Sequence, residues 1–516
     1  MKKTILLCIV MLWYSLSLSA QTVQVFSKTG LLKGTYSTIK AALATTTDGD
    51  SLILSAHTFK ESQLKPHVYD YIIYQGSISG TDTSTIDAGG NGACFEYCTG
   101  TIRDIVLTGA KYISSVSRGG AISTFQSGLI TGNTTIRNNE GYYMGAMLIN
   151  SGKINGHVKI INNKSIGLNL GVIGVYDSCF IEDSVIIAHN IGKLTGAIQG
   201  PDGVGVEGRN RKLVISGNVR IFDNYGDSSG AIVLGYGGGS TFQMTGGSIS
   251  HNTSASGNGA AIRSLYLNAP TVSIDSIVTP NIMLKNVQIY NPSASGKRQN
   301  EIYVVFSKKP SILYTEGCWW GNSDTTGLIK VDSGTDFKMP NWAIADWGAL
   351  PFGFLFSNVR AQMKLNTGAA LAANALPGLM ANFWASTGYF SAATAYINPS
   401  NLLSSDYYFP SSGPYTANAC IDADTFRPST KQLAIVEQGF EQVKVYPNPA
   451  NDVLHIQGIE VGSSLALYDI SGKLLKHEEA LSNNLNIDVK DLASGIYQLK
   501  ISTKDGKEGT AKVMKE

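Results

Sequence analysis

The segment from Asn138 to Asn150, NNEGYYMGAMLIN, decides the fold because its parts recur along the chain. One part is an isoleucine followed three residues later by an asparagine, which we write IxxN. It occurs at Ile136–Asn139, Ile160–Asn163, Ile187–Asn190, Ile221–Asn224 and Ile249–Asn252. Recurrence of one pattern in a fixed order indicates an internal structural repeat.

The second part is a Gly-Ala step followed by an apolar residue, and it recurs once in each repeat alongside IxxN. The aligned steps are Gly120-Ala121-Ile122, Gly145-Ala146-Met147, Gly171-Val172-Ile173, Gly196-Ala197-Ile198, Gly230-Ala231-Ile232 and Gly259-Ala260-Ala261. The intervals between their glycines are 25, 26, 25, 34 and 29 residues. The apolar stretches between them are short and β-branched, as in Val158–Ile161. Short strands at this period favour a right-handed parallel β-helix over a helical solenoid or a propeller.

This architecture also explains the residue types. Glycine and asparagine tolerate the left-handed backbone conformation that tight corners need. Stacked asparagines at equivalent corners can hydrogen-bond along the ladder. We therefore interpret IxxN and Gly-Ala as architectural motifs rather than catalytic ones.

The repeats resemble those of the chlamydial polymorphic outer-membrane proteins, which pair FxxN with GGAI. Gly119-Gly120-Ala121-Ile122 contains GGAI, although this chain has isoleucine where that family prefers phenylalanine. The resemblance covers residues 119–270 and implies a surface-exposed, β-helical adhesin. A short helix at Ile39–Leu43 is expected to cap the first coil. The segment Cys318–Asn322, CWWGN, could cap the last coil or offer a sugar platform, and we favour the cap.

The N-terminus predicts export. Lys2 and Lys3 precede the apolar run Ile5–Leu18 and then Ser19-Ala20-Gln21, which is typical of a signal peptide over residues 1–20. No later window is apolar enough to span a membrane. The net charge of +2 and the absence of a basic stripe argue against nucleic-acid binding. Cys94 and Cys98 could form a disulfide or be buried as small apolar residues, and we favour burial.

After the β-helix, expected over residues 21–332, the composition shifts towards Ala, Phe, Tyr and Pro. Asn382–Phe390, NFWASTGYF, resembles the FxAxxGxF strand pair of bacterial immunoglobulin-like modules. Pro377-Gly378 argues against a helix at Ala369–Ala375. We expect an immunoglobulin-like β-sandwich over 333–430 and a linker over 431–442.

The C-terminal segment, 443–516, alternates like a small β-sandwich. Three of its blocks resemble the type A C-terminal sorting domain of the type IX secretion system in Bacteroidetes. The residues that carry the resemblance are Tyr446, Pro447, Asn448 and Pro449, then Gly472 and Lys473, then Gly495 and Tyr497. The resemblance implies that the type IX machinery is a partner and that the protein reaches the cell surface or the medium.

Residues that break the repeat are the candidate ligand-binding residues, because insertions in solenoids form loops on one face. The longest repeat contains PDGVGVEGRNRKL from Pro201, with the charged residues Asp202, Glu207, Arg209, Arg211 and Lys212. Glu182, Arg209 and Arg211 are weak catalytic candidates. His189 and His251 each stand directly before an IxxN asparagine, which indicates a stacked polar corner rather than a metal site.

The sequence therefore predicts an exported, all-β, non-catalytic surface protein for adhesion or glycan binding, with a glycan or host surface as its ligand and no cofactor. One alternative is a polysaccharide lyase or glycoside hydrolase acting in a β-helix groove, which would need Ca²⁺ if it is a lyase. Another is a structural surface component.

Overall fold

The computed structural model describes residues 21–67, 70–112, 119–167, 171–201, 211–235, 240–264, 280–292, 300–304, 311–352, 356–386, 388–408, 417–426, 443–469, 472–504 and 508–516. About 57% of the chain is strand and about 1% is helix, which confirms the all-β prediction. The chain forms two compact units. The first runs through Ala343 and includes Leu365–Thr367 and Ala375–Pro377, and the second contains most of the remainder. The predicted signal peptide lies outside the described residues.

The first unit begins with a hairpin and a short helix. Strands β1 (Val23–Phe26) and β2 (Leu32–Tyr36) pair antiparallel, and α2 follows at Ile39–Leu43, as predicted. The Thr38 hydroxyl accepts a hydrogen bond from the Ala41 N–H at 3.2 Å, which caps the helix N-terminus. The Glu61 carboxylate accepts the N–H groups of Ile39 and Lys40 at 2.6 and 2.9 Å. The apolar side of the helix is buried against the core.

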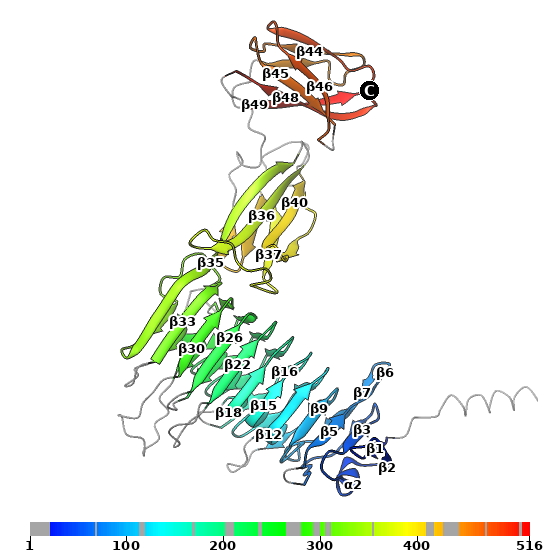
Figure 1. Ribbon diagram of the computed structural model, residues 1–516, viewed down its shortest axis with the longest axis vertical. Helices are drawn as coiled ribbons and strands as arrows, with labels where there is room; N and C mark the ends of the chain where they lie inside the picture. The colour runs from blue at the N-terminus through cyan, green and yellow to red at the C-terminus, as the bar shows by residue number, and fades with distance from the viewer. Residues whose placement is uncertain are drawn as a thin grey trace, which may run out of the picture. The chain divides into compact units, whose positions relative to one another are not determined.

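Beyond the helix, the chain passes repeatedly through three ladders of parallel strands (Figure 1). The first ladder contains β3 (Ser51–Leu54), β5 (Ile72–Gln75), β9 (Gly100–Arg103), β12 (Ile122–Thr131), β15 (Met147–Ile154), β18 (Ile173–Ile181), β22 (Lys212–Ser216), β26 (Thr241–Thr245), β30 (Asn281–Lys285), β33 (Ser311–Cys318) and the start of β35 (Thr335–Phe352). Beyond β18 a second branch continues with β21 (Ile198–Gln199), β25 (Ile232–Leu234), β29 (Asn258–Ser264), β32 (Asn300–Val304) and β34 (Ile329–Val331).

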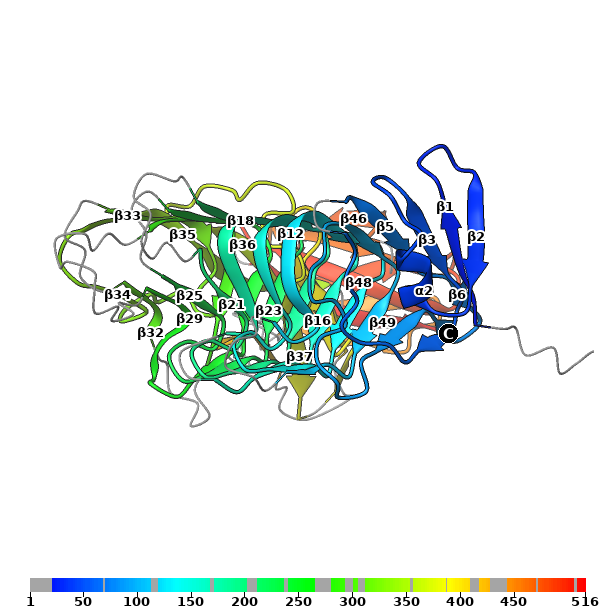
Figure 2. The same ribbon diagram turned by 90° about the horizontal axis from the view of Figure 1, so that it is seen from below.

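The other two ladders are shorter. The second contains β4 (Thr58–Phe59), β8 (Thr85–Asp87), β10 (Val106–Thr108), β13 (Thr135–Arg137), β16 (Lys159–Ile161), β19 (Ile186–Ala188), β23 (Arg220–Phe222), β27 (Ser248–Ser250) and β31 (Gln288–Tyr290). The third contains β11 (Lys111–Tyr112), β14 (Glu140–Gly141), β17 (Lys164–Ser165), β20 (Ile191–Gly192), β24 (Tyr225–Gly226) and β28 (Thr253–Ser254). Figure 2 shows β16 and β23 set apart from β12 and β18 of the first ladder. A small hairpin, β6 (Ile78–Ser79) and β7 (Asp82–Thr83), stands apart from the ladders.

The predicted repeat aligns the ladders. The IxxN isoleucines pair in register from Ile136 to Ile160, Ile187, Ile221 and Ile249, and Ile289 extends the series. All of these side chains are fully buried in one continuous core. Each coil therefore buries its apolar side chains against the coils before and after it.

The Gly-Ala alignment needs one correction. Met147, Ile173, Ile198 and Ile232 pair in sequence, as the alignment predicts. Ile262, and not Ala261, pairs with Ile232. The alignment is one residue off because Gly259 is three residues before Ile262, whereas Gly230 is two residues before Ile232.

At the last coil, Trp319 and Trp320 are both fully buried. The Trp319 N–H donates to the Val287 carbonyl at 3.0 Å, so CWWGN continues the second ladder beyond β31. The two indoles fill the core rather than offering an exposed stacking surface. Cys94 and Cys98 are free and buried, as expected. Burial raises the pKa of the Cys94 thiol to about 12.

In the second unit, one group of strands forms two sheets. The first contains β36 (Phe356–Leu365), β40 (Leu402–Tyr408) and β38 (Tyr389–Phe390). The second has the order β39 (Thr394–Tyr396), β37 (Met380–Ala385), β41 (Ala417–Ile421) and β42 (Asp424–Phe426). NFWASTGYF crosses from β37 to β38, and the rings of Phe383 and Phe390 meet at 5.3 Å between their centroids. Residues 369–375 are not helical, in agreement with the sequence.

The C-terminal strands form two further sheets with a core of their own. One sheet contains β43 (Lys444–Tyr446), β44 (Val453–Gln457) and β47 (Asn484–Asp488). The other has the order β46 (Leu474–Glu479), β45 (Ser464–Tyr468), β48 (Gly495–Ser502) and β49 (Glu508–Lys515). Leu454, Leu467 and Leu499 lie at the centre of their shared core.

Candidate functional site

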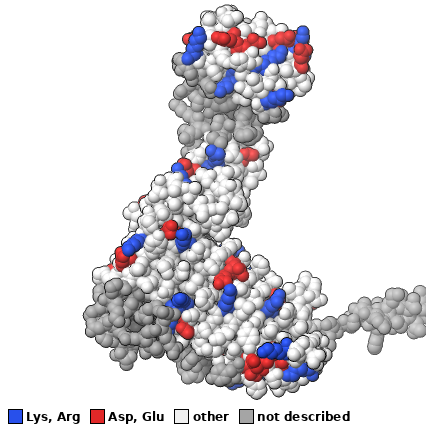
Figure 3. Space-filling view, viewed as in Figure 1, with Lys and Arg blue, Asp and Glu red and all other residues white. Residues whose placement is uncertain are grey.

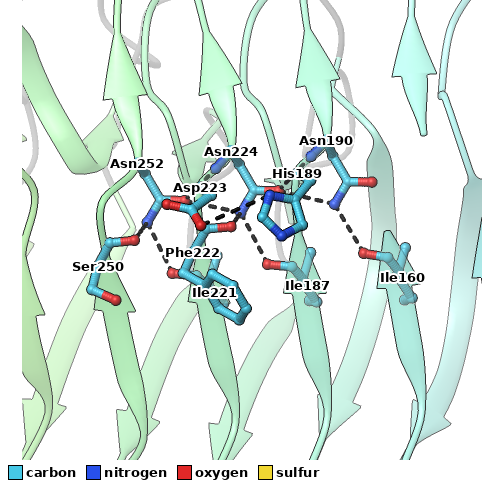
Figure 4. Close-up of polar contacts among 10 residues, drawn as sticks. All are labelled: Ile160, Ile187, His189, Asn190, Ile221, Phe222, Asp223, Asn224, Ser250 and Asn252. Carbon is cyan, nitrogen blue, oxygen red and sulfur yellow. Dashed lines mark hydrogen bonds and ion pairs between the residues drawn. The ribbon is translucent and has the colours of Figure 1, made fainter. Parts of the chain in front are cut away.

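The asparagines of IxxN form a buried ladder at the corner between the second and third ladders (Figure 4). The Oδ1 atom of Asn224 accepts hydrogen bonds from the backbone N–H of Asn190 at 3.0 Å and from its Nδ2 at 2.9 Å. The Nδ2 atom of Asn224 donates to the carbonyls of Ile187 and Phe222, both at 2.9 Å. The amide-to-amide contact repeats through Asn139, Asn163, Asn190, Asn224, Asn252 and Asn291. The predicted hydrogen bonding along the stack is confirmed.

This asparagine ladder ends on a carboxylate. The backbone N–H of Asn291 donates to Oε1 of Glu301 at 2.8 Å, and its Nδ2 donates to Oε2 at 2.7 Å. Glu301 is 3% exposed. In the rest of the ladder, the Oδ1 atom of the next asparagine accepts these two hydrogen bonds. At Asn291 the two carboxylate oxygens of Glu301 accept them instead. Sequence reasoning missed Glu301, and the only signal for it is a charged residue directly before the apolar strand residues 302–304.

Outside this ladder runs a column of residues in the left-handed conformation. The φ angles are 55° at Asn138, 55° at Asn162, 55° at His189, 53° at Asp223 and 56° at His251. The stacked corner predicted for the two histidines is confirmed. His189 Nδ1 lies 3.8 Å from Asp223 Oδ2, and both side chains are about half exposed. Among the described residues, no group of three or more His, Cys, Asp or Glu is placed to hold a metal ion.

The carboxylates nearest the first ladder stabilise corners. Asp104 and Asp183 also have left-handed φ angles, of 57° and 67°. The Asp104 Oδ1 accepts the Asn133 N–H at 2.8 Å, and the Asp183 Oδ2 accepts the Gly156 N–H at 3.1 Å. Glu182 forms an ion pair with Lys153 on the neighbouring coil. The pair Glu182-Asp183 thus lies in a turn after β18 and serves coil-to-coil contacts.

The charged insertion lies between β21 and β22, which both pair with β18. Asp202, Glu207 and Arg209 lie outside the described residues. Arg211 is 1% exposed, and its guanidinium carbon is 5.2 Å from the centroid of the Tyr176 ring. Lys212 begins β22 with an exposed side chain. A ligand-binding role for this insertion stays a prediction.

The weak catalytic candidates within the described residues do not meet. Ile181 pairs with Ile215, so Glu182 follows beside Ser216. Arg211 directly precedes β22 and is five residues before Ser216, roughly 16 Å along the backbone at the rise of a β-strand. A catalytic role for Glu182, Arg209 and Arg211 stays a prediction.

In the C-terminal segment, Asn448 of Tyr446-Pro447-Asn448-Pro449 binds the last strand. Its Nδ2 donates to the Lys512 carbonyl at 2.6 Å, and its Oδ1 accepts the Met514 N–H at 2.7 Å. These two side-chain bonds take the place of backbone strand pairing, because Pro447 and Pro449 on either side have no backbone N–H. Tyr446 itself is 47% exposed.

The other two blocks form a turn and a strand start. Gly472 and Lys473 close a turn in which both N–H groups bond to Asp469, each at 3.0 Å. Gly472 has a φ of 82°, which the turn requires and which favours glycine. Gly495 begins β48, and the hydroxyl of the largely buried Tyr497 donates to the Ala493 carbonyl at 2.5 Å. The three blocks thus serve the fold of this domain and leave Tyr446 at its surface.

Comparison with known proteins assigns this domain. Residues 444–516 match the family model described as the secretion system C-terminal sorting domain. No curated protein sequence matches the chain.

Three solved structures each match about a third of this chain. PorZ, a bacterial surface component of the type IX secretion system of Porphyromonas gingivalis, is 14% identical over 34% of this chain and 23% of its own, with a TM-score of 0.15. Latent PorU of the same organism is 12% identical over 37% and 22%, with a TM-score of 0.12. A C-terminal intimin fragment in complex with its receptor's intimin-binding domain is 9% identical over 34% and 62%, with a TM-score of 0.16. The chain covers less than two thirds of each structure, and TM-scores this low do not establish a shared fold.

The molecule is thus an all-β protein with a C-terminal sorting domain of the type IX secretion system. That domain indicates export to the cell surface or the extracellular space. It also indicates recognition by the type IX machinery. No helix among the described residues is long and apolar enough to cross a membrane.

Proposed function

We propose that this exported protein is a non-catalytic surface protein that binds glycans or adheres to surfaces. In this proposal the first unit is a right-handed parallel β-helix over residues 21–332, followed by an immunoglobulin-like sandwich over 333–430 and a linker over 431–442. The resemblance of the repeats to those of the chlamydial surface adhesins supports an adhesive role. The sorting domain supplies the route to the surface.

The observation that carries the proposal is the regular register of the outer face of the first ladder. This register runs along the second halves of β12, β15 and β18 and continues through β22, β26, β30 and β33. Side chains at equivalent positions stand in a straight row, about 4.8 Å apart from strand to strand. One such row is Leu129, Lys153, Phe180, Val214, Gln243, Met283 and Tyr314. Figure 3 shows charged side chains of both signs scattered among uncharged ones on the visible face of this unit. A long, regular surface suits contact with an extended polymer, whereas an active site usually encloses its substrate in a pocket.

The test is a binding screen of residues 21–516 against an array of neutral and acidic glycans and against host-matrix proteins. We expect saturable binding to at least one class. Absence of binding to every class would overturn the proposal.

A parallel incubation with acidic and neutral polysaccharides, with and without Ca²⁺, tests the catalytic alternative. New reducing ends or unsaturated products would replace our proposal with a lyase or hydrolase. Self-assembly into ordered arrays without any ligand would replace it with a structural surface component.

A further inference from the structure

One face of the sheet formed by β37, β39, β41 and β42 has an unusual composition. Burial alternates along β37 and β41, so every second side chain points outward. Phe383 and Ala419 are buried on the inner side. The side chains on the outer side include Asn382, Trp384, Thr394, Tyr396, Asn418 and Thr425. Among the described residues of these four strands, no outward side chain is charged.

Two aromatic side chains stand out from this face. Trp384 is 43% exposed and Tyr396 is 68% exposed. Tyr396 lies opposite Met380, four residues along β37 from Trp384. At the rise of a strand this separation is roughly 13 Å. The two rings are therefore far enough apart to contact different units of one extended chain.

Amide and hydroxyl groups fill the space between the rings. Asn382 and Thr394 are a directly opposed pair, midway between the aromatic positions. Asn418 is opposed to Trp384 on the other side of β37. Neutral amides and hydroxyls both donate and accept hydrogen bonds. The face thus combines two aromatic rings and the side chains of Met380 and Cys420 with uncharged hydrogen-bonding groups.

This chemistry selects one class of ligand. A sugar ring has apolar C–H faces that pack on aromatic rings and hydroxyl edges that bond to amides. An acidic polymer or an anionic membrane would call for cationic side chains, which this face lacks. A protein interface of ordinary size needs a larger apolar centre than two separated rings provide.

We propose that the outer face of this sheet, at Trp384, Tyr396, Asn382 and Asn418, is a binding site for a neutral, extended polysaccharide. The site rests on the proposed glycan-binding function and adds a binding surface in the second unit to the ladder face of the first unit. Trp384 and Tyr396 stack on two sugar units, and Asn382 hydrogen-bonds to hydroxyl groups between them.

The test is affinity electrophoresis of residues 21–516 in native gels that contain hydroxyethyl cellulose, xylan, mannan or the acidic control polygalacturonate. We expect the wild-type protein to be retarded by at least one of the three neutral polymers. Trp384→Ala and Tyr396→Ala should each weaken that binding by about tenfold, as truncation of an aromatic anchor does. Trp384→Phe should retain most of the binding.

Tyr389→Ala is the matched control. Tyr389 is 64% exposed but lies on β38, in the other sheet, where it stacks on Tyr408. Its removal should leave the retardation unchanged. A second readout is tryptophan fluorescence, whose ligand-induced change in the wild type should disappear in Trp384→Phe.

The outcomes separate this site from the broader function. Wild-type retardation that survives Trp384→Ala and Tyr396→Ala would overturn the site but leave glycan binding standing. Binding only to polygalacturonate or to a matrix protein would overturn the neutral ligand class. Failure to bind any glycan or matrix protein would overturn the site and the proposed function together.

Discussion

At the residue scale, the asparagine ladder stabilises the coils because each side chain satisfies backbone groups on two coils. The Oδ1 atom of Asn224 accepts from Asn190, and its Nδ2 reaches the carbonyls of Ile187 and Phe222. The site is buried, so water cannot replace these partners. A truncated ladder position therefore leaves several buried polar groups unsatisfied.

We expect Asn224→Ala to lower the free energy of unfolding by about 3 kcal/mol, since each orphaned buried group costs about 1–3 kcal/mol. The urea midpoint measured by circular dichroism reports the loss. Thr253→Ala, on the outer face of the next coil, should change the free energy of unfolding by less than about 0.5 kcal/mol. Equal midpoints for Asn224→Ala and the wild type would contradict the role of the ladder.

Asp50 gives the first hairpin a predictable response to acid. Burial alone would raise the pKa of its carboxyl, but the Lys33 ammonium at 2.6 Å and the Thr47 N–H and hydroxyl hold the pKa below its ordinary value of 3.8. A lowered folded-state pKa stabilises the fold above the ordinary value, and this stabilisation is lost as the pH falls through the folded-state pKa.

Urea midpoints measured from pH 6 down to about pH 2 should therefore fall less steeply for Asp50→Asn than for the wild type. Asp82→Asn, at an exposed position on β7, serves as the control and should follow the wild-type curve. Parallel curves for Asp50→Asn and the wild type would show that this carboxyl does not couple folding to pH.

At the element scale, each coil contacts only its neighbours, so a whole coil can be removed without breaking the register. Asn163 and Asn190 are 27 residues apart and occupy equivalent ladder positions. Deletion of residues 163–189 joins Asn162 directly to Asn190 and places β16 where β19 stood.

We expect this in-register deletion to keep a cooperative thermal transition, with a melting temperature lowered by no more than about 5 °C. Deletion of residues 163–186 shifts the ladder by three residues and should abolish the transition. Circular dichroism melting curves compare the two. The same behaviour for both deletions would mean that coil register does not govern stability.

The register of the repeated parallel strands could be predicted from sequence because its signals are local and recur. Ile160 and Asn163 recur at fixed spacing, and stacking forces them into register. The error at Gly259-Ala260-Ala261 arose because this repeat has one more residue between its glycine and the paired isoleucine, Ile262, and the motif alone does not show it. Glu301 was missed because it lies ten residues after its partner, Asn291, whereas the ladder asparagines pair across 24 to 39 residues, so the repeat gives no signal for it.

The aromatic face of the second unit could not be predicted for the same reason. The alternation in NFWA predicts a strand with Trp384 on one side. That Tyr396 and Asn418 share this side depends on how β39 and β41 pair with β37, and no short-range pattern specifies that pairing.

At the scale of the whole molecule, the chain combines a repetitive unit, a sheet with an aromatic face and a C-terminal sorting domain. The sorting domain folds around its own core, and its motif residues serve that fold and leave Tyr446 at the surface. Residues 444–516 therefore direct export, and in our proposal the residues before them bind the ligand.

The most direct test of the account is the binding of a fluorescent neutral polysaccharide to cells of a type IX-secreting bacterium that produce this chain. Cells with the full chain, or their culture medium, should bind the polymer that the purified protein binds. Cells with a chain ending at residue 443 should bind none at the surface or in the medium, while their lysate binds it. Equal surface binding by both strains, or no binding by full-chain cells whose protein is detected outside the cell by antibody, would contradict the account.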